Sequence, residues 1–141
     1  IDTLRGGRVA DILNGGNGDD KIEGGQGADI LTVGAGADVF RYQSALASPN
    51  AAPDQITDFV IGTDKLGFGL IDADPLAPGD QAFAFIGTAE FTGGGTGEIR
   101  YKGTGGNLVV YVDVDGNGSE DMTIILQGLA GQTLTPGDFN L

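Results

Sequence analysis

Aspartates recur every nine residues near the start of the chain, and glycine-rich stretches separate them. Carboxylates and the backbone carbonyls that glycine turns expose are hard oxygen ligands, of which calcium takes about six to eight. Acidic groups this close together repel one another, and glycine loses more backbone entropy on ordering than any other residue. The pattern therefore predicts a segment that a bound cation holds together. The aspartates in phase are Asp2, Asp11, Asp20, Asp29 and Asp38.

A large apolar side chain follows each of these aspartates two residues later. Such a unit gives a very short strand whose apolar residue points inward, and because one strand of this kind buries little, the repeats must stack. The phasing with apolar residues disfavours a flexible linker, and the lack of a following Lys-Ser/Thr and helix disfavours a phosphate-binding loop. The apolar series is Leu4, Leu13, Ile22, Leu31 and Phe40.

The repeat has the form G-G-x-G-x-D-x-U-x, where U is a large apolar residue, and on this pattern residues 1–41 resemble the RTX (hemolysin-type) calcium-binding β-roll. The resemblance implies that two repeats make one turn of a parallel β-roll, with each calcium ion between loops two repeats apart. One site would then join the Asp11 and Asp29 loops, and another would join the Asp20 and Asp38 loops. A third would pair the Asp20 loop with the loop before Asp2, which lies outside this chain.

Two valines depart from the pattern. Val9 replaces the glycine at the fourth position of its repeat, where a positive φ is expected, so the site at the Asp11 loop fits least well. Val33 replaces the first glycine of another repeat. The resemblance assigns metal-ligand positions to Asp2, Gly6, Arg8, Asp11, Gly15, Gly16, Asn17, Gly18, Asp20, Gly24, Gly25, Gln26, Gly27, Asp29, Gly34, Gly36 and Asp38.

The nine-residue phase ends near residue 41 and gives way to strand-like runs separated by glycine, proline and aspartate. Apolar and polar residues alternate in the later runs, which is typical of antiparallel strands with one buried face. We expect an all-β fold, with a parallel β-roll of nonapeptide repeats over residues 1–41 and a small antiparallel β-sandwich cap over residues 42–141. The expected strands lie at 54–60, 65–70, 82–87, 97–102, 107–114 and 121–128.

The second part of the chain resembles the C-terminal domain of serralysin-type secreted metalloproteases, on the segments ADVFRY, DQITDFVIGTDKLGF and the final DFNL. The resemblance implies export by the type I route, with an uncleaved signal at the extreme C-terminus that combines an acidic residue with hydrophobic ones. Asp138, Phe139 and Leu141 fit that signal, and Asn140 departs from it. The same four residues equally suit a last strand that closes the sandwich, and neither interpretation excludes the other.

Two further places offer oxygen ligands. The segment VDVDGNGSEDM carries oxygen-bearing side chains at alternate positions and glycine at the sixth, as in the first part of an EF-hand loop. Its twelfth position is Ile124, so the bidentate acid of that loop is absent, and a tight turn between two strands is the alternative. Asp54, Asp58 and Asp64 form a looser cluster near the end of the roll, in which Asp58 either lies in a turn or closes the last calcium site. The candidate further ligands are Asp58, Asp113, Asp115, Asn117 and Asp121.

Composition excludes several kinds of protein. The 141 residues include no cysteine and no histidine, which removes disulfides, thiolate chemistry, a Ser-His-Asp triad and a histidine-ligated zinc. A net charge of −13 makes nucleic acid a poor partner, and no apolar run is long enough to span a membrane. No HExxH or G-x-S-x-G motif is present, so we expect no enzyme active site in these residues.

These observations favour a non-catalytic, calcium-binding C-terminal module of a secreted bacterial protein. The resemblance implies a Gram-negative source, type I export and calcium-induced folding outside the cell. The expected partners are calcium ions, the type I secretion apparatus and upstream domains of the parent chain. One alternative is a module that binds a polysaccharide substrate, for which Arg41, Arg100 and Lys102 are too few to build an obvious basic groove. Another is an adhesive or self-assembling surface module.

Overall fold

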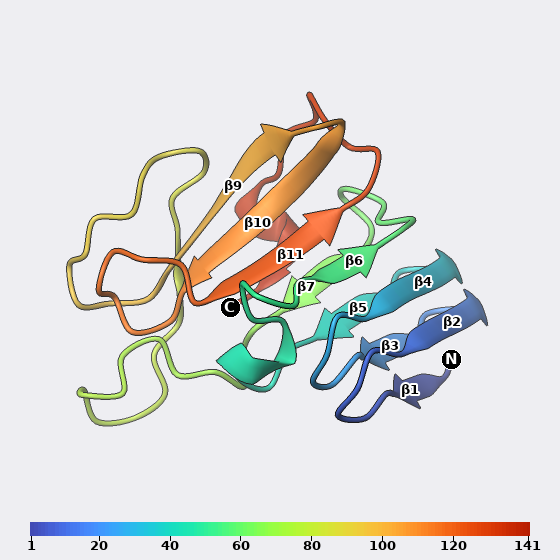
Figure 1. Ribbon diagram of the computed structural model, residues 1–141, viewed down its shortest axis with the longest axis horizontal. Helices are drawn as coiled ribbons and strands as arrows, with labels where there is room; N and C mark the ends of the chain where they lie inside the picture. Colours follow the sequence, from blue (N-terminus) through green and yellow to red (C-terminus); the bar gives the residue numbers. More distant parts are fainter.

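A computed structural model describes residues 1–141 as two β-sheets that enclose one core (Figure 1). Sheet A contains, in spatial order, β1 (Thr3–Arg5), β3 (Lys21–Glu23), β5 (Val39–Arg41), β7 (Lys65–Gly67) and β12 (Phe139–Asn140). Sheet B contains β2 (Ile12–Asn17), β4 (Ile30–Ala35), β6 (Asp54–Ile56), β11 (Met122–Leu126), β10 (Asn107–Asp113), β9 (Glu98–Thr104) and β8 (Ala84–Phe85). The connections include two short 3-10 helices, η1 (Ala45–Ala47) and η2 (Pro136–Asp138). No helix is long and apolar enough to cross a membrane.

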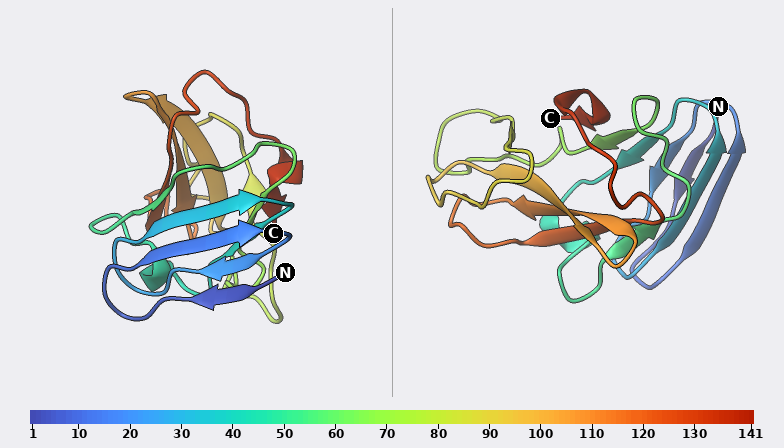
Figure 2. Two further views of the ribbon diagram at one scale, coloured as in Figure 1. Left: turned by 90° about the vertical axis from the view of Figure 1, so that its right-hand side faces the viewer. Right: turned by 90° about the horizontal axis from the view of Figure 1, so that it is seen from above.

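The nine-residue repeat places successive short strands alternately in sheet A and sheet B. Each strand therefore pairs in parallel with a strand one full turn later, so that Leu4 lies opposite Ile22 and Leu13 lies opposite Leu31. This is the β-roll that the resemblance implies, with two repeats in each turn, and the predicted all-β class is confirmed. The blue and cyan strands stack as successive turns at one end of the molecule (Figure 2).

The roll continues beyond the glycine repeats. Leu31 lies opposite Ile56 and Phe40 lies opposite Leu66, so β6 and β7 add a further turn to the two sheets. The connection through η1 takes up the extra residues of this longer turn. Neither sheet is interrupted near residue 41, where the sequence suggests a boundary between roll and cap.

The strands that follow β7 extend the same two sheets. Strand β11 pairs in parallel with β6 and antiparallel with β10, which in turn pairs antiparallel with β9. Strand β12 pairs in parallel with β7 and so extends sheet A. The expected sandwich is present, but it shares its sheets with the roll. The strands expected in 97–102, 107–114 and 121–128 correspond to β9, β10 and β11, whereas those in 54–60, 65–70 and 82–87 are shorter than expected.

The hydrophobic core runs along the whole molecule between the sheets. In the repeats, Ile22, Leu31 and Phe40 are fully buried, as the inward-pointing apolar series predicts. Leu4 and Leu13 in the first turn are only partly buried. The core continues into the apolar residues of β10 and β11.

Candidate metal centres in the turns of the roll

The phased aspartates, together with Asp54 and Asp64, form a ladder of hydrogen bonds across successive turns, which we call the aspartate ladder. Each lies just before a strand or at its first residue, and the Oδ1 of the later aspartate accepts a hydrogen bond from the backbone N–H of the aspartate one turn earlier. The bonds join Asp2 to Asp20 (2.6 Å), Asp11 to Asp29 (2.9 Å), Asp20 to Asp38 (2.7 Å), Asp29 to Asp54 (3.0 Å) and Asp38 to Asp64 (3.1 Å). The loops paired by the sequence resemblance are therefore neighbours in the roll.

Two members of the ladder, Asp54 and Asp64, are missing from the ligand positions inferred from the sequence. They fall outside the nine-residue phase, because 25 and 26 residues separate them from Asp29 and Asp38. Both nevertheless keep the local signature of the repeat, since a buried apolar residue, Ile56 or Leu66, follows two positions later. A search for this signature without the fixed phase could have found them.

Four ladder aspartates keep one carboxylate oxygen without a hydrogen-bond partner. The Oδ2 atoms of Asp20, Asp29, Asp38 and Asp54 are buried and accept no hydrogen bond, and none of these residues is more than 1% exposed. Burying a charged oxygen without a partner costs on the order of several kcal/mol. A cation coordinated in the turns would remove this cost, so the residues of the ladder fit a metal.

Asp58 and Asp64 have both carboxylate oxygens paired with backbone N–H groups, and Asp11 has one oxygen paired in this way. Asp11 Oδ2 accepts a hydrogen bond from the N–H of Gly7 at 2.6 Å, and Asp64 Oδ2 accepts one from the N–H of Val60 at 2.8 Å. The two oxygens of Asp58 accept hydrogen bonds from the N–H groups of residues 33 and 34, at 3.0 and 2.7 Å. Asp58 therefore ties its own turn to the turn that precedes Asp38.

Glycine allows the turns to approach one another closely. Gly34 has a φ of 91°, and a Cβ atom there would overlap the carbonyl of Gly16 in the turn below. A Cβ atom at Gly15 would lie only 2.8 Å from Oδ2 of Asp20. Val9 adopts no positive φ and is exposed, so its loop accommodates a side chain without backbone strain. The turns thus bring carbonyls and carboxylates together.

Burial raises the pKa of several ladder carboxyl groups. The pKa of Asp54 rises from 3.8 to about 8, chiefly because burial penalises the charged form, although a hydrogen bond from the N–H of Asp29 acts in the opposite direction. Burial also raises the pKa values of Asp29 and Asp64. The Tyr42 hydroxyl is buried without a partner, and burial together with the charges of Asp54 and Asp29 raises its pKa well above the usual value. The buried surroundings of Asp29, Tyr42 and Asp54 therefore disfavour negative charge.

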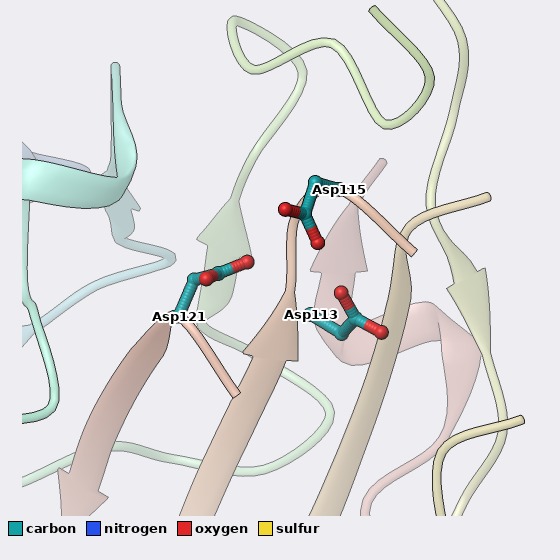
Figure 3. Close-up of side chains that lie close together, drawn as sticks. All are labelled: Asp113, Asp115 and Asp121. Atoms are coloured by element: carbon teal, nitrogen blue, oxygen red, sulfur yellow. The ribbon is translucent and has the colours of Figure 1, made fainter. Parts of the chain in front are cut away.

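A second group of acids lies in the connection between β10 and β11 (Figure 3). Carboxylate oxygens of Asp113, Asp115 and Asp121 lie within 4.8 Å of one another. The two oxygens of the fully buried Asp113 accept hydrogen bonds from the N–H groups of Asn117 (3.2 Å) and Gly118 (2.7 Å). Burial raises the pKa of Asp113, and these N–H groups lower it. This segment connects two antiparallel strands, and its own backbone supplies partners for its carboxylates.

Residues 138–141 lie beside the last turn of the roll. Asp138 is buried, and its Oδ1 accepts a hydrogen bond from the N–H of Gly62 at 2.7 Å. Its Oδ2 accepts hydrogen bonds from the N–H and hydroxyl of Thr135, at 2.7 and 3.0 Å. Phe139 is buried, and with Asn140 it forms β12. The segment therefore serves as the last strand of sheet A.

The fold defines the class of this protein as an RTX-type β-roll. Two solved structures that share the fold are subunits of a mannuronan C5-epimerase from Azotobacter vinelandii. The AlgE6R3 subunit has a TM-score of 0.57 at 21% identity, over 98% of this chain and 76% of that chain. The AlgE6R2 subunit has a TM-score of 0.58 at 21% identity, over 96% of this chain and 90% of that chain. No curated protein sequence gives a significant match.

The family described as Peptidase M10 serralysin C terminal matches residues 10–141. The chain belongs to this family. Its resemblance to the RTX and serralysin C-terminal domains is thereby confirmed, as is the prediction that the chain is a non-catalytic module.

Proposed function

We propose that the module binds calcium ions in the turns of the roll and that this binding drives its folding outside the cell. The observation that carries the proposal is the set of four buried, unpartnered Oδ2 atoms in the aspartate ladder. Calcium suits these turns because it takes carboxylates and carbonyls together in flexible geometry, whereas magnesium demands near-ideal octahedral coordination and loses its water reluctantly. The presence of RTX-type domains in secreted proteins supports the extracellular setting.

The proposed ligands are the ladder carboxylates and the turn carbonyls assigned by the resemblance, together with Asp54 and Asp64. The Asp20 and Asp38 loops would hold one ion, and the loop of Asp29 would share ions with those of Asp11 and Asp54. The segment of Asp113, Asp115, Asn117 and Asp121 is a weaker candidate, because its own backbone already supplies partners for its carboxylates.

The same residues explain how calcium would act as a folding switch. Without the ion, folding brings like charges together and buries four carboxylate oxygens that have no partner. With the ion, the free energy of binding becomes free energy of folding. Each site that binds only the folded chain adds about 2.7 kcal/mol when free calcium is about 100 times the Kd. The roll shares sheet B with the antiparallel strands and sheet A with β12, so order in the turns supports the rest of the module.

A calcium titration of chelator-treated chain, followed by far-ultraviolet circular dichroism, tests the proposal. We expect a cooperative gain of β signal with calcium and no such gain with magnesium at the same concentration. A chain that is fully folded in chelator and indifferent to calcium would overturn the proposal.

We also propose export by the type I route of a Gram-negative bacterium, with residues 138–141 as part of the signal. The membership of the serralysin C-terminal family and the acidic-then-apolar pattern of Asp138, Phe139 and Leu141 support it. Deletion of residues 138–141 should abolish secretion by a type I exporter while calcium still binds the purified chain. Undiminished secretion of the deletion variant would place the signal elsewhere.

A further inference from the structure

The contacts that stack the roll are of the same kind in every turn. The hydrogen bonds of the aspartate ladder recur from one turn to the next, and so do the inward-pointing apolar residues. A completed roll makes more contacts than one that skips a turn, but the turns meet one at a time while the chain folds. If β1 met β5 before β3, it would find an aspartate and an apolar residue at the expected places. Only side chains that differ between turns can disfavour this wrong contact.

Side chains of this kind lie at the ends of three strands in sheet A. Strands β1, β3 and β5 end at Arg5, Glu23 and Arg41, and their parallel register places these residues side by side. The Glu23 carboxylate lies 3.1 Å from Arg5 Nε on one side and 3.1 Å from Arg41 Nη1 on the other. The charges therefore alternate from turn to turn, and we call these three residues the charge row. Gly67 of β7 lies opposite Arg41, so the row ends there.

Glu23 is the member of the charge row that depends on both neighbours. It is only 7% exposed, and besides the two guanidinium groups it has a 2.6 Å hydrogen bond from the Gln43 amide. Removal of a positive partner from a buried carboxylate is strongly unfavourable. The side chains of Arg5 and Arg41 are 64% and 32% exposed, so solvent weakens each ion pair and the row adds little to overall stability. Its effect lies in the choice between neighbouring turns.

The other outward-facing residues of the turns do not alternate in charge. In β1, β3 and β5 they are Thr3, Lys21 and Val39, of which only Lys21 is charged. On sheet B, the hydroxyl groups of Thr32 and Thr57 lie 2.7 Å apart and join two turns without any charge. The charge row is therefore the feature that distinguishes one turn from the next.

We propose that the charge row fixes the order in which the turns stack. With β3 between β1 and β5, each arginine faces Glu23. If β3 were skipped, Arg5 would lie opposite Arg41, and like charges directly opposite one another destabilise neighbouring strands. The inference goes beyond the calcium function, because ions in the aspartate ladder would hold adjacent turns together without distinguishing one turn from another.

Disulfide trapping tests the proposal, because the chain contains no cysteine of its own. Thr3 lies opposite Lys21, and neighbouring strands about 5 Å apart are within reach of a disulfide, so Thr3→Cys with Lys21→Cys reports the native order. Strand β3 separates Thr3 from Val39 by two strand spacings, about 10 Å, which a disulfide cannot span. Thr3→Cys with Val39→Cys therefore forms a bridge only when β1 meets β5. Both chains are refolded in calcium and glutathione buffer, and the bridged monomer is measured by peptide mass spectrometry.

The native-order bridge should predominate when the charge row is unaltered. Glu23→Gln should raise the share of the skipped-turn bridge about fivefold, because two cross-strand ion pairs are lost. Arg8→Gln is the matched control, since Arg8 lines the same hollow as Arg5 and Arg41 but forms no ion pair, and it should leave the share unchanged. Reversal of all three charges, by Arg5→Glu, Glu23→Arg and Arg41→Glu together, should return the share to that of the unaltered row.

Equal shares of the skipped-turn bridge in Glu23→Gln and Arg8→Gln would overturn the proposal, and so would a charge-reversed row that skips turns as often as Glu23→Gln does. If Glu23→Gln failed to fold, the charge-reversed chain would decide, because a native-order bridge in it supports the row and its absence refutes the row. Calcium binding is measured in the same chains by competition with a chelating dye. A fivefold change in chains that bind no calcium would refute the calcium function and leave this inference intact.

Discussion

The aspartate ladder and the loop at residues 113–121 both gather carboxylates, but they differ in how those carboxylates are satisfied. In the ladder, one oxygen of Asp20, Asp29, Asp38 and Asp54 is buried without a partner. In the loop, the buried Asp113 has both oxygens paired with backbone N–H groups. A turn that satisfies its own acids can fold without an ion, whereas the ladder places acids where only another ligand can satisfy them.

The largest effect expected from this difference is that of calcium removal. Chelation should strip amide-exchange protection from the strands of residues 1–41, because the unpartnered carboxylates lie in their turns. Hydrogen–deuterium exchange with mass spectrometry, resolved by peptide, measures this in calcium and in chelator. Protection over 1–41 that is unchanged in chelator would show that the ladder is stable without a metal.

Single substitutions should separate the two regions next. Asp20→Asn should weaken calcium binding by at least about tenfold, because the substitution removes a carboxylate ligand. Asp20 is hydrogen-bonded both to the loop of Asp2, one turn earlier, and to the loop of Asp38, one turn later. Asp113→Asn is the matched change in the loop and should leave the number of bound calcium ions unchanged. Calorimetric titration of both variants gives the affinity and the stoichiometry. If Asp113→Asn lost a bound calcium ion and Asp20→Asn did not, the loop at residues 113–121 would be the calcium site and the ladder would not.

The stability of the folded chain should fall with rising pH in chelator and should rise with pH in calcium. In chelator, the raised pKa of Asp54 means that the folded chain favours the protonated carboxyl. Its stabilising contribution is complete below the unfolded pKa of 3.8 and is lost as the pH rises through about 8. Asp29 and Asp64 act in the same direction. Calcium requires ionised carboxylates, so its affinity should increase over the same pH range.

Thermal unfolding at a series of pH values in chelator, together with calcium titrations at the same values, checks this prediction. Asp54→Asn removes the titrating group and should flatten the chelator curve, while repulsion among the other acids remains. It should also be more stable than the unaltered chain at high pH in chelator and less stable in calcium. The same pH slope in the variant would assign the effect to other groups.

The most local of these effects concerns the packing of turns. Gly34→Ala should destabilise the calcium-bound chain by about 1–3 kcal/mol, because a side chain is strained at positive φ, and the clash with the Gly16 carbonyl should add to this. Gly62→Ala is the control, since Gly62 also has a positive φ, of 81°, but no atom lies within 4 Å of its added Cβ. Urea unfolding in calcium compares the two. Equal losses would show that strain alone matters, without close contact between turns.

The sequence was sufficient to predict the repeating part of this architecture. Aspartate and apolar residues in a nine-residue phase predicted stacked repeats, and the resemblance to the RTX β-roll implied that loops two repeats apart are neighbours, as far as the loop of Asp38. The nine-residue phase does not include Asp54 and Asp64. Because the connection through η1 is longer, they follow their hydrogen-bond partners by 25 and 26 residues, which are not multiples of nine. Periodicity detects equal spacing, whereas the hydrogen bonds of the ladder depend only on where the strands lie.

Other features depend on contacts that no local pattern contains. The alternating acids of residues 113–121 suit a metal loop and a turn equally well, and only the structure shows Asp113 paired with Asn117 and Gly118. Likewise, the runs after residue 42 predicted a sandwich but not its attachment, which depends on the pairing of β11 with β6. The grouping of Arg5, Arg8 and Arg41 also required the stacking of the turns, whereas from the sequence Arg41 was considered together with Arg100 and Lys102.

The continuity of both sheets gives the roll a direction of assembly. Strands β6 and β7 pair with β11 and β12 on one side and with β4 and β5 of the roll on the other. A turn that adds to an existing edge gains an interface with its neighbour, so we expect β6 and β7 to offer a formed edge from which the roll grows toward lower residue numbers. Each turn would then be laid down on the one that follows it in the sequence.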